Sequence, residues 1–296
     1  MLKQIIDKRN YIIFLLIIIL FITITILNIK SVKIKTKNYN YFGENISIEI
    51  HTNKNTDNIF KNINKIFEKY NKFYKNPNQN NNKDFIKLLK YGKSLYKKTN
   101  GYIDITSYKL LDSIKKNKPY SFKSTITSLD FKNKETLKNI NIDAIIGSYT
   151  IKEIEKYLYK NKINSYIIKE DSNIIIGKNY NNQKYNIPII KDSNIIEIIT
   201  AENKSIAIKG NTKSFKPYMI NPITSEKNKE NKLIAVISND INEANYIANT
   251  LYLMSQQEGK EYVKKYKVEV LWYTPNKTLK TKGFKKYNLK IKNTSS

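Results

Sequence analysis

The irregular order of strand-like and helix-like segments is the feature that most constrains the fold of this chain. Tyr41–Ile50 contains the alternation I-S-I-E-I, which is typical of a strand with one buried face. By contrast, Asp57–Tyr74 and Asp84–Lys98 repeat apolar residues at helical spacing. Helices are also predicted over Ile145–Lys160, Asn242–Leu253 and Gly259–Tyr266, and short strands over Tyr166–Ile168, Ile174–Ile176, Ile195–Ile199, Ile206–Ile208, Leu233–Ile237 and Val268–Tyr273. Because these segments do not alternate as βαβ units, the sequence predicts an α+β fold with mixed or antiparallel sheets flanked by helices.

An apolar run near the N-terminus predicts a membrane anchor in front of this domain. Tyr11–Leu27 is apolar except for two threonines and spans about 26 Å as a helix, enough for a bilayer core. Since no small-residue cleavage site follows, we expect an uncleaved, single-pass transmembrane helix over 11–29; the alternative is a buried core helix. The expected division is a short tail (1–10), the anchor (11–29), a basic linker (30–40), the domain (41–274) and a basic tail (275–296). Lysines on both sides of the run leave its orientation open.

Composition restricts the partners and the metal chemistry. The 296 residues include 53 Lys+Arg against 25 Asp+Glu, a formal net charge of +28. A nucleic-acid partner is nevertheless not predicted, because Arg9 is the only arginine and arginine is the side chain that reads guanine edges. The charge instead favours contact with anionic lipid or polymer. The absence of cysteine and the single histidine, His51, exclude thiolate and multi-histidine metal sites; His51 is expected in a turn or at the surface.

The stretch T-N-G-Y-I-D-I-T, Thr99–Thr106, is the strongest candidate for a functional segment. Gly101 can close the preceding helix, because glycine tolerates the left-handed conformation found just past a helix end. Tyr102, Ile103 and Ile105 are then expected in an extended segment that carries one carboxylate, Asp104. A charge among apolar neighbours needs hydrogen-bond donors or a ligand. The alternative is an aspartate that only stabilises a turn.

Four stretches, read in order, resemble the ApbE family, the FAD:protein FMN transferases. Thr99–Thr106 resembles the family's T-x-G-[AY]-F-D-I-T. The later stretches N-I-D-A-I-I-G-S-Y (Asn141–Tyr149), Y-M-I-N-P-I-T-S (Tyr218–Ser225) and A-N-Y-I-A-N-T-L (Ala244–Leu251) resemble its D-L-G-A-I-A-K-G-Y, H-I-I-D-P-R-T-G and A-D-A-L-A-T-A-L. Y-F-G-E-N, Tyr41–Asn45, is a weaker match to x-M-G-T. The resemblance implies a membrane-anchored α+β protein, with its domain outside the cytoplasm, that binds FAD and uses magnesium to move FMN onto a threonine or serine of a partner protein.

The resemblance also implies where the site lies. Flavin-contacting positions fall on Tyr102, Ile103, Asp104, Asn141, Gly147 and Met219, and metal-binding positions on Ala144, Asn245 and Asn249. If the resemblance holds, the segments around Asp104, Ala144 and Asn245 should meet at one cleft.

Several of these positions depart from the family pattern. Aspartate is replaced by Asn141, Asn221 and Asn245, threonine by Asn249, lysine by Gly147, histidine by Tyr218, and T-S-G by Ile208-Lys209-Gly210. Because magnesium prefers oxygen ligands that include one or two carboxylates, these changes weaken a cation site. Asp143, where the family has glycine, is a candidate for a compensating carboxylate.

These observations leave three functional hypotheses. In the first, the chain is an FMN transferase whose ligands are FAD and Mg²⁺ and whose partner is a flavin-acceptor protein of the membrane. In the second, it is a catalytically inactive flavin-binding pseudoenzyme or scaffold. In the third, which depends on charge alone, it tethers anionic polymer or lipid. The catalytic residues are not assigned.

Overall fold

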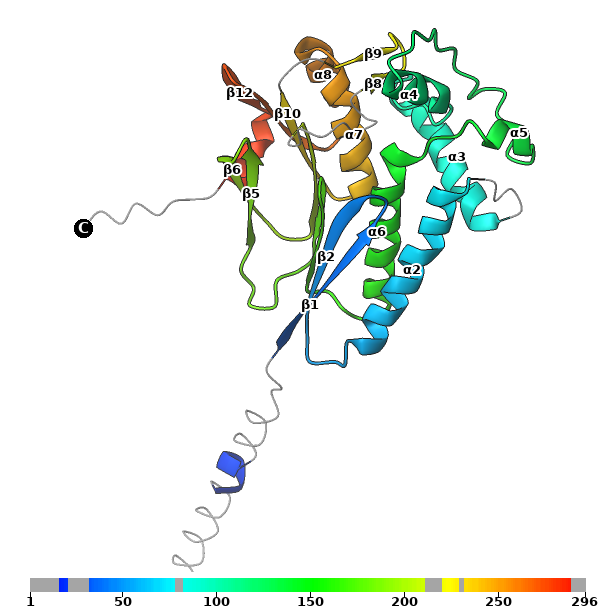
Figure 1. Cartoon of the computed structure of the whole chain (residues 1–296). Helices are drawn as coiled ribbons and strands as arrows, with labels where there is room; N and C mark the ends of the chain where they lie inside the picture. Colours follow the sequence, from blue (N-terminus) through cyan, green and yellow to red (C-terminus); the bar gives the residue numbers. More distant parts are fainter. Residues whose placement is uncertain (1–15, 21–31, 78–81, 211–219, 229–231, 289–296) are drawn as a thin grey trace, which may run out of the picture.

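An eight-stranded antiparallel sheet forms the centre of the molecule (Figure 1). The computed structural model describes residues 16–20, 32–77, 82–210, 220–228 and 232–288. The sheet order is β1-β2-β3-β4-β7-β10-β11-β12. Its strands are β1 (Lys33–Tyr41), β2 (Glu44–Thr52), β3 (Tyr166–Glu170), β4 (Asn173–Ile176), β7 (Lys204–Lys209), β10 (Leu233–Ser238), β11 (Glu269–Thr274) and β12 (Lys277–Lys280).

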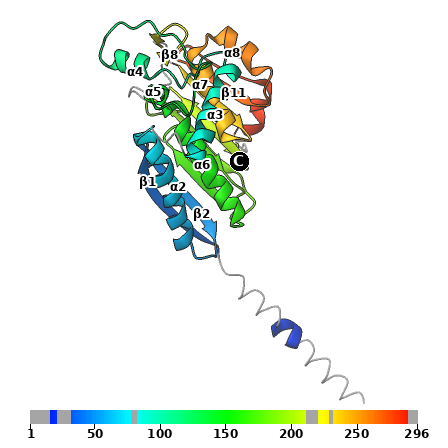
Figure 2. The ribbon, with the colours of Figure 1, turned by 90° about the vertical axis from the view of Figure 1, so that its right-hand side faces the viewer.

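Helices cover one face of this sheet (Figure 2). They are α2 (Asp57–Lys75), α3 (Lys83–Lys98), α6 (Asp143–Lys160) and α7 (Ile241–Leu253), with the shorter α4 (Tyr108–Lys115), α5 (Lys134–Leu137) and α8 (Gln256–Val263) around them. Two of the four long helices begin at a side-chain cap: Asn82 accepts from two amides of α3, and Asp240 from two amides of α7. Their apolar stripes form the main core with alternate residues of the strands, and α7 packs directly on β7 and β10.

A hairpin of β5 (Tyr185–Lys191) and β6 (Asn194–Ala201) covers the other face, together with a 3₁₀ helix, η2 (Lys282–Tyr287). The central strand β10 shows the consequence for the sequence. Ile234 and Val236 point into the helical core, whereas Leu233, Ala235 and Ile237 point into the core under the hairpin. Because β10 is buried on both faces, its sequence is a continuous apolar run. The remaining strands, β8 (Ile220–Asn221) and β9 (Glu226–Lys227), form a separate short ladder.

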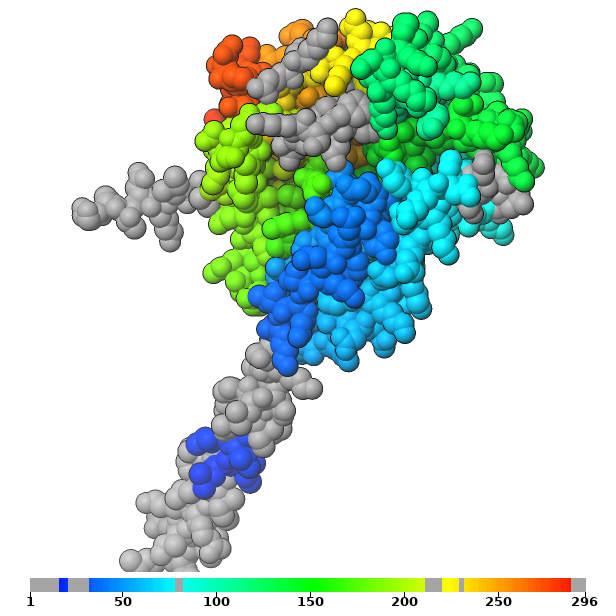
Figure 3. Space-filling model, in the orientation of Figure 1, coloured from blue at the N-terminus to red at the C-terminus, as the bar shows by residue number. Residues whose placement is uncertain are grey.

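The α+β class with antiparallel sheets and flanking helices is confirmed, and two predictions of local structure are wrong at the ends of the domain. Most of the expected linker, 30–40, is strand β1, which pairs along its whole length with β2 and lies at the surface (Figure 3). The expected tail begins with β12, paired to β11, and continues to Phe284, which is fully buried under the hairpin. In both places the strand lies at an edge of the sheet and its lysines are exposed. The sequence therefore lacks the alternation of apolar and polar residues that marks a strand with one buried face.

Two further expectations are wrong. Tyr102–Ile105 is a series of turns and not an extended segment, because the chain bonds back onto the end of α3: the amide of Ile103 donates to Thr99 Oγ1 at 3.0 Å. His51 is not at the surface. It lies buried in β2, with Glu49 Oε1 2.6 Å from its Nε2 and Ser165 Oγ 3.0 Å from its Nδ1.

The predicted anchor lies mostly outside the described residues. Residues 16–20 are helical and expose their apolar side chains. Within the part of the chain that the structure describes, no helix has the length and apolar character needed to cross a bilayer. The transmembrane helix over 11–29 therefore stays a prediction.

Candidate functional site

Asp104 organises the turn that the T-N-G-Y-I-D-I-T segment forms. It is buried, and its Oδ1 accepts from the Thr106 amide at 2.7 Å and from Thr106 Oγ1 at 2.6 Å. These bonds agree with the reading of Asp104 as a turn-stabilising residue. Its second oxygen, Oδ2, is also buried and has no hydrogen-bond partner among the described residues. A buried carboxylate oxygen without a donor is costly, so this atom can also receive a ligand.

The beginning of α6 is attached to this turn through Asn141. The Asn141 amide donates to the Ile105 carbonyl at 2.7 Å. Its side chain also holds the first residue of the helix, since Oδ1 accepts from the Asp143 amide at 3.1 Å and Nδ2 donates to Asp143 Oδ2 at 3.0 Å. Asn141 therefore fixes the position of the first turn of α6 relative to the Asp104 turn.

Helix α7 approaches the same turn of α6 through two asparagines. Asn245 Nδ2 lies 2.8 Å, and Asn249 Nδ2 3.2 Å, from the carbonyl oxygen of Ala144. The two asparagines are one helical turn apart, so both face the same carbonyl. Three segments that are distant in sequence thus meet at the beginning of α6, where the family resemblance led us to expect them together.

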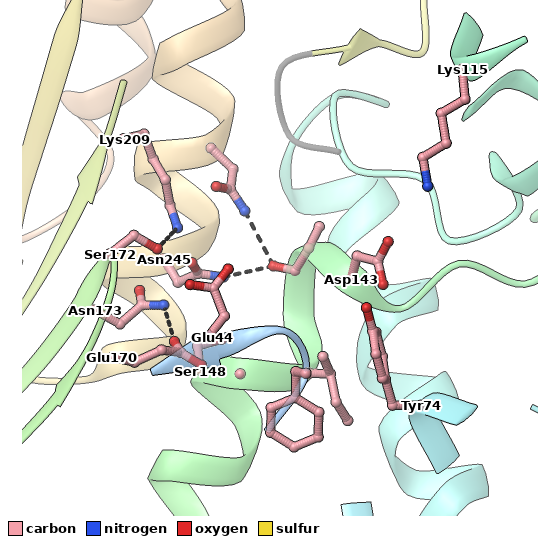
Figure 4. Close-up of a pocket in the computed structure, with 15 residues that line it drawn as sticks. Glu44, Tyr74, Lys115, Asp143, Ser148, Glu170, Ser172, Asn173, Lys209 and Asn245 are labelled. Atoms are coloured by element: carbon pink, nitrogen blue, oxygen red, sulfur yellow. Dashed lines mark hydrogen bonds between the residues drawn. The ribbon is translucent and has the colours of Figure 1, made fainter. Parts of the chain in front are cut away.

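Two cavities lie at this meeting point. The larger has a volume of about 300 Å³ and includes Ala144, Gly147, Asn245 and Asn249 in its wall (Figure 4). The smaller, about 30 Å³, is lined by Tyr102, Ile103, Asp104 and Asn141 among others. Ala144 and Asn249 line both, so the two cavities adjoin there. All predicted site residues in the described part of the chain border one or both; Met219 lies outside the described residues.

The wall of the larger cavity carries charges of both signs. Glu44, Asp143 and Glu170 contribute carboxylates, and Lys115 and Lys209 contribute ammonium groups. Lys209 is only 3% exposed, and its Nζ donates to Ser172 Oγ at 3.0 Å. Figure 4 shows Lys209 and Ser172 together on one side of the cavity, with Asp143 and Tyr74 on the other.

The carboxyl group of Glu170 packs directly against Gly147. A Cβ at Gly147 would lie 2.1 Å from Glu170 Oε1, so the Glu170 carboxyl group occupies the space that a side chain at position 147 would need. Glu170 also accepts from Asn173 Nδ2 at 2.5 Å. The resemblance expects a lysine at 147; in this chain the buried lysine of the cavity is Lys209, on strand β7 instead.

Tyr74 and Asp143 form a second polar pair in the wall. Burial, together with the charge of Asp143 and a hydrogen bond to it, raises the pKa of Tyr74 to about 12. The Asp143 carboxyl group is thus engaged by Tyr74 and by Asn141.

Sequence reasoning missed most of the charged wall. Glu44 lies in the weakly matching stretch Tyr41–Asn45 and could have been found there. Tyr74 lies at the end of the helix predicted over Asp57–Tyr74, and no motif marks it. Glu170 and Asn173 flank the β3–β4 turn, and no motif marks them.

The residues present do not fit a divalent cation at Ala144. Its carbonyl accepts two amide donors, and an N–H group cannot ligate a metal. Among the described residues, no group of three or more histidine, aspartate and glutamate side chains is arranged to hold a metal ion.

The fold is shared with flavin transferases of known structure. The flavin transferase ApbE from Vibrio cholerae superposes with a TM-score of 0.72 at 16% identity, over 86% of this chain and 99% of that one. The ApbE protein from Thermotoga maritima gives 0.70 at 13% identity, over 87% and 100%. The flavinyl transferase ApbE from Pseudomonas stutzeri, in its apo form, gives 0.67 at 12% identity, over 88% and 99%.

The chain belongs to the ApbE family, whose model matches residues 31–272. Comparison with curated protein sequences returns no match. The family assignment that the four sequence stretches suggested is therefore confirmed.

Proposed function

We propose that this chain is a membrane-anchored flavin transferase that binds FAD in the two adjoining cavities and passes its FMN part to a threonine or serine of a partner protein. The observation that carries the proposal is the meeting of the Asp104 turn, the first turn of α6 and helix α7 around one pair of cavities. This meeting is what the family resemblance predicts for a flavin site.

The chemistry that the proposal requires is a phosphoryl transfer. The hydroxyl oxygen of the acceptor attacks the phosphorus on the FMN side of the FAD diphosphate. The bond from that phosphorus to the bridging oxygen breaks, AMP leaves with the bridging oxygen, and the hydroxyl proton is released. Positive charge near the diphosphate favours such a step, and Lys209 is the buried cation of the described cavity wall.

A second candidate function is flavin binding without transfer. It is favoured by the two amide bonds to the Ala144 carbonyl, which occupy the position that the resemblance gives to the metal. Phosphoryl transfer without a metal has less stabilisation of the developing charge. In this case FAD would stay bound and intact.

The experiment uses the full chain in detergent, with FAD and an acceptor protein that carries the flavinylation motif of the family. A transferase releases AMP and makes the acceptor fluorescent and heavier by the mass of FMN. A flavin-binding protein quenches FAD fluorescence but releases no AMP. Absence of any flavin binding would refute both candidates, and salt-sensitive binding to anionic vesicles would then support the polymer or lipid tether.

A further inference from the structure

The carbonyl oxygen of Ala144 is saturated by donors from within the protein. Asn245 and Asn249 approach it from helix α7, 101 and 105 residues further along the chain, with donor–acceptor distances of 2.8 and 3.2 Å. The two residues are 2% and 1% exposed. Ala144 also lies within α6, where its carbonyl oxygen accepts an amide along the helix, so the two side-chain donors leave no lone pair of this oxygen for a cation.

The alternative orientation of the two amides is unfavourable. If both side-chain amides were rotated by half a turn, their oxygen atoms would face the Ala144 carbonyl oxygen. Only a bound cation could hold three such oxygens together. None of the three carries a charge, whereas magnesium usually takes one or two carboxylates. Among the carboxylates of the cavity wall, Asp143 lies beside Tyr74 and away from Asn245 (Figure 4), and Glu170 accepts from Asn173. Glu44 lines the same cavity as Asn245, so it is the carboxylate that a cation there could use.

One polar atom of this arrangement remains available. Asn249 Oδ1 is buried, has no hydrogen-bond partner among the described residues, and belongs to a side chain that lines both cavities. A single neutral oxygen is a poor cation site but a good acceptor for a hydroxyl or N–H group of a ligand. The ribityl chain and the ring N–H of a flavin offer such donors.

We infer that the amides of Asn245 and Asn249 replace a divalent cation at the Ala144 carbonyl. This amide clamp, defined as Asn245, Asn249 and the carbonyl of Ala144, joins the first turn of α6 to α7 and shapes the cavity without metal. The flavin part of the inference rests on the proposed function: FAD binds to this chain equally well with and without magnesium.

The metal arm of the test needs no flavin. The Tm of the full chain in detergent is measured by thermal unfolding in EDTA and in millimolar MgCl₂. In a separate titration, Mn²⁺ binding is followed through the electron paramagnetic resonance signal of free Mn²⁺. The clamp predicts no change in Tm and no saturable Mn²⁺ binding. Saturable binding by the wild-type chain that is lost in Asn245→Ala would overturn the inference.

A gain-of-function variant sharpens this arm. Asn245→Asp places a carboxylate against the Ala144 carbonyl, so its Tm should fall by several degrees in EDTA and recover in magnesium. Asn242→Asp introduces the same charge on α7 outside the clamp and should show no metal response. If Asn245→Asp does not fold, the wild-type metal measurements decide alone.

The flavin arm separates this inference from the proposed function. If FAD binds with the same affinity, within about twofold, in EDTA and in magnesium, the result supports both the amide clamp and the proposed function. FAD binding that requires magnesium overturns the clamp and keeps the function. No FAD binding in either solution refutes the function, and the metal arm still decides the clamp.

Discussion

At the scale of single residues, the larger cavity has its buried positive charge on Lys209 of β7. The family resemblance expects a lysine at position 147 instead. A side chain at position 147 would have to displace the Glu170 carboxyl group, which packs against Gly147. Lys209 enters the same cavity from β7, at a position where the family resemblance expects serine. A lysine is a compact charge on a flexible stem, so it can reach a phosphate from a different element.

Replacing Lys209 with methionine should therefore weaken the binding of FAD by about tenfold, which corresponds to about 1.4 kcal/mol. Methionine preserves most of the packing volume and removes the charge. Riboflavin has no phosphate, so its affinity should change little. Quenching of flavin fluorescence in a titration measures both affinities.

Lys204→Met is the matched control for this change. Lys204 lies on the same strand, donates to Asn239 and does not line the cavity. Equal losses of FAD and riboflavin affinity in Lys209→Met would mean that Lys209 supports the fold and does not contact the diphosphate.

At the scale of elements, the site depends on the packing of α6 against α7. Besides the amide clamp, Lys152 of α6 connects the two helices: its Nζ lies 2.6 Å from Glu155 Oε2 and 3.1 Å from Oδ2 of Asp240, the residue that caps α7. The Lys152 side chain is 20% exposed. Such a partly buried, two-partner ion pair contributes more than an isolated surface pair.

Lys152→Met should lower the free energy of unfolding by about 1 kcal/mol, because Asp240 and Glu155 lose their shared partner. Lys156→Met is the control. Lys156 also pairs within α6, with Glu153, but is 56% exposed, so its loss should cost less. Urea unfolding of both variants measures the two free energies. Equal losses of stability would mean that the contact of Lys152 with Asp240 of the neighbouring helix adds nothing to the free energy of unfolding.

The elements also show what the sequence can and cannot predict. Helices α2, α3 and α7 follow from apolar stripes at helical spacing, and β10 follows from its apolar run. Strand β1 was missed because its side chains are mostly exposed lysines and other polar residues, and β5 because Pro188 interrupts its pattern. The site positions were predicted from the family resemblance alone, whereas Glu170 and Lys209 join the cavity through tertiary contacts that no local pattern records.

At the scale of the whole molecule, buried tyrosines dominate the response to alkali. Burial raises the pKa of several tyrosines above its ordinary value near 10, among them Tyr39, Tyr70, Tyr91 and Tyr166. Below pH 10 these groups are protonated in both states. Above it the unfolded chain loses protons that the folded chain keeps, so stability falls as the pH rises.

We therefore expect alkaline unfolding to coincide with tyrosine ionisation. Phenolate absorbance should rise only in part above pH 10, and the remainder should appear together with the loss of circular dichroism. Full ionisation while the protein is still folded would show that these tyrosines are accessible to solvent.

The central claim is that the paired cavities at Ala144 hold FAD. Its most direct test is an equilibrium titration of FAD into the full chain in detergent, compared with Ala144→Trp, which fills the junction of the cavities, and with Tyr159→Trp on an exposed site of the same helix. The account predicts saturable binding at one site in the wild type and in Tyr159→Trp, and its loss in Ala144→Trp. Absence of binding in the wild type, or undiminished binding in Ala144→Trp that still folds, would contradict it.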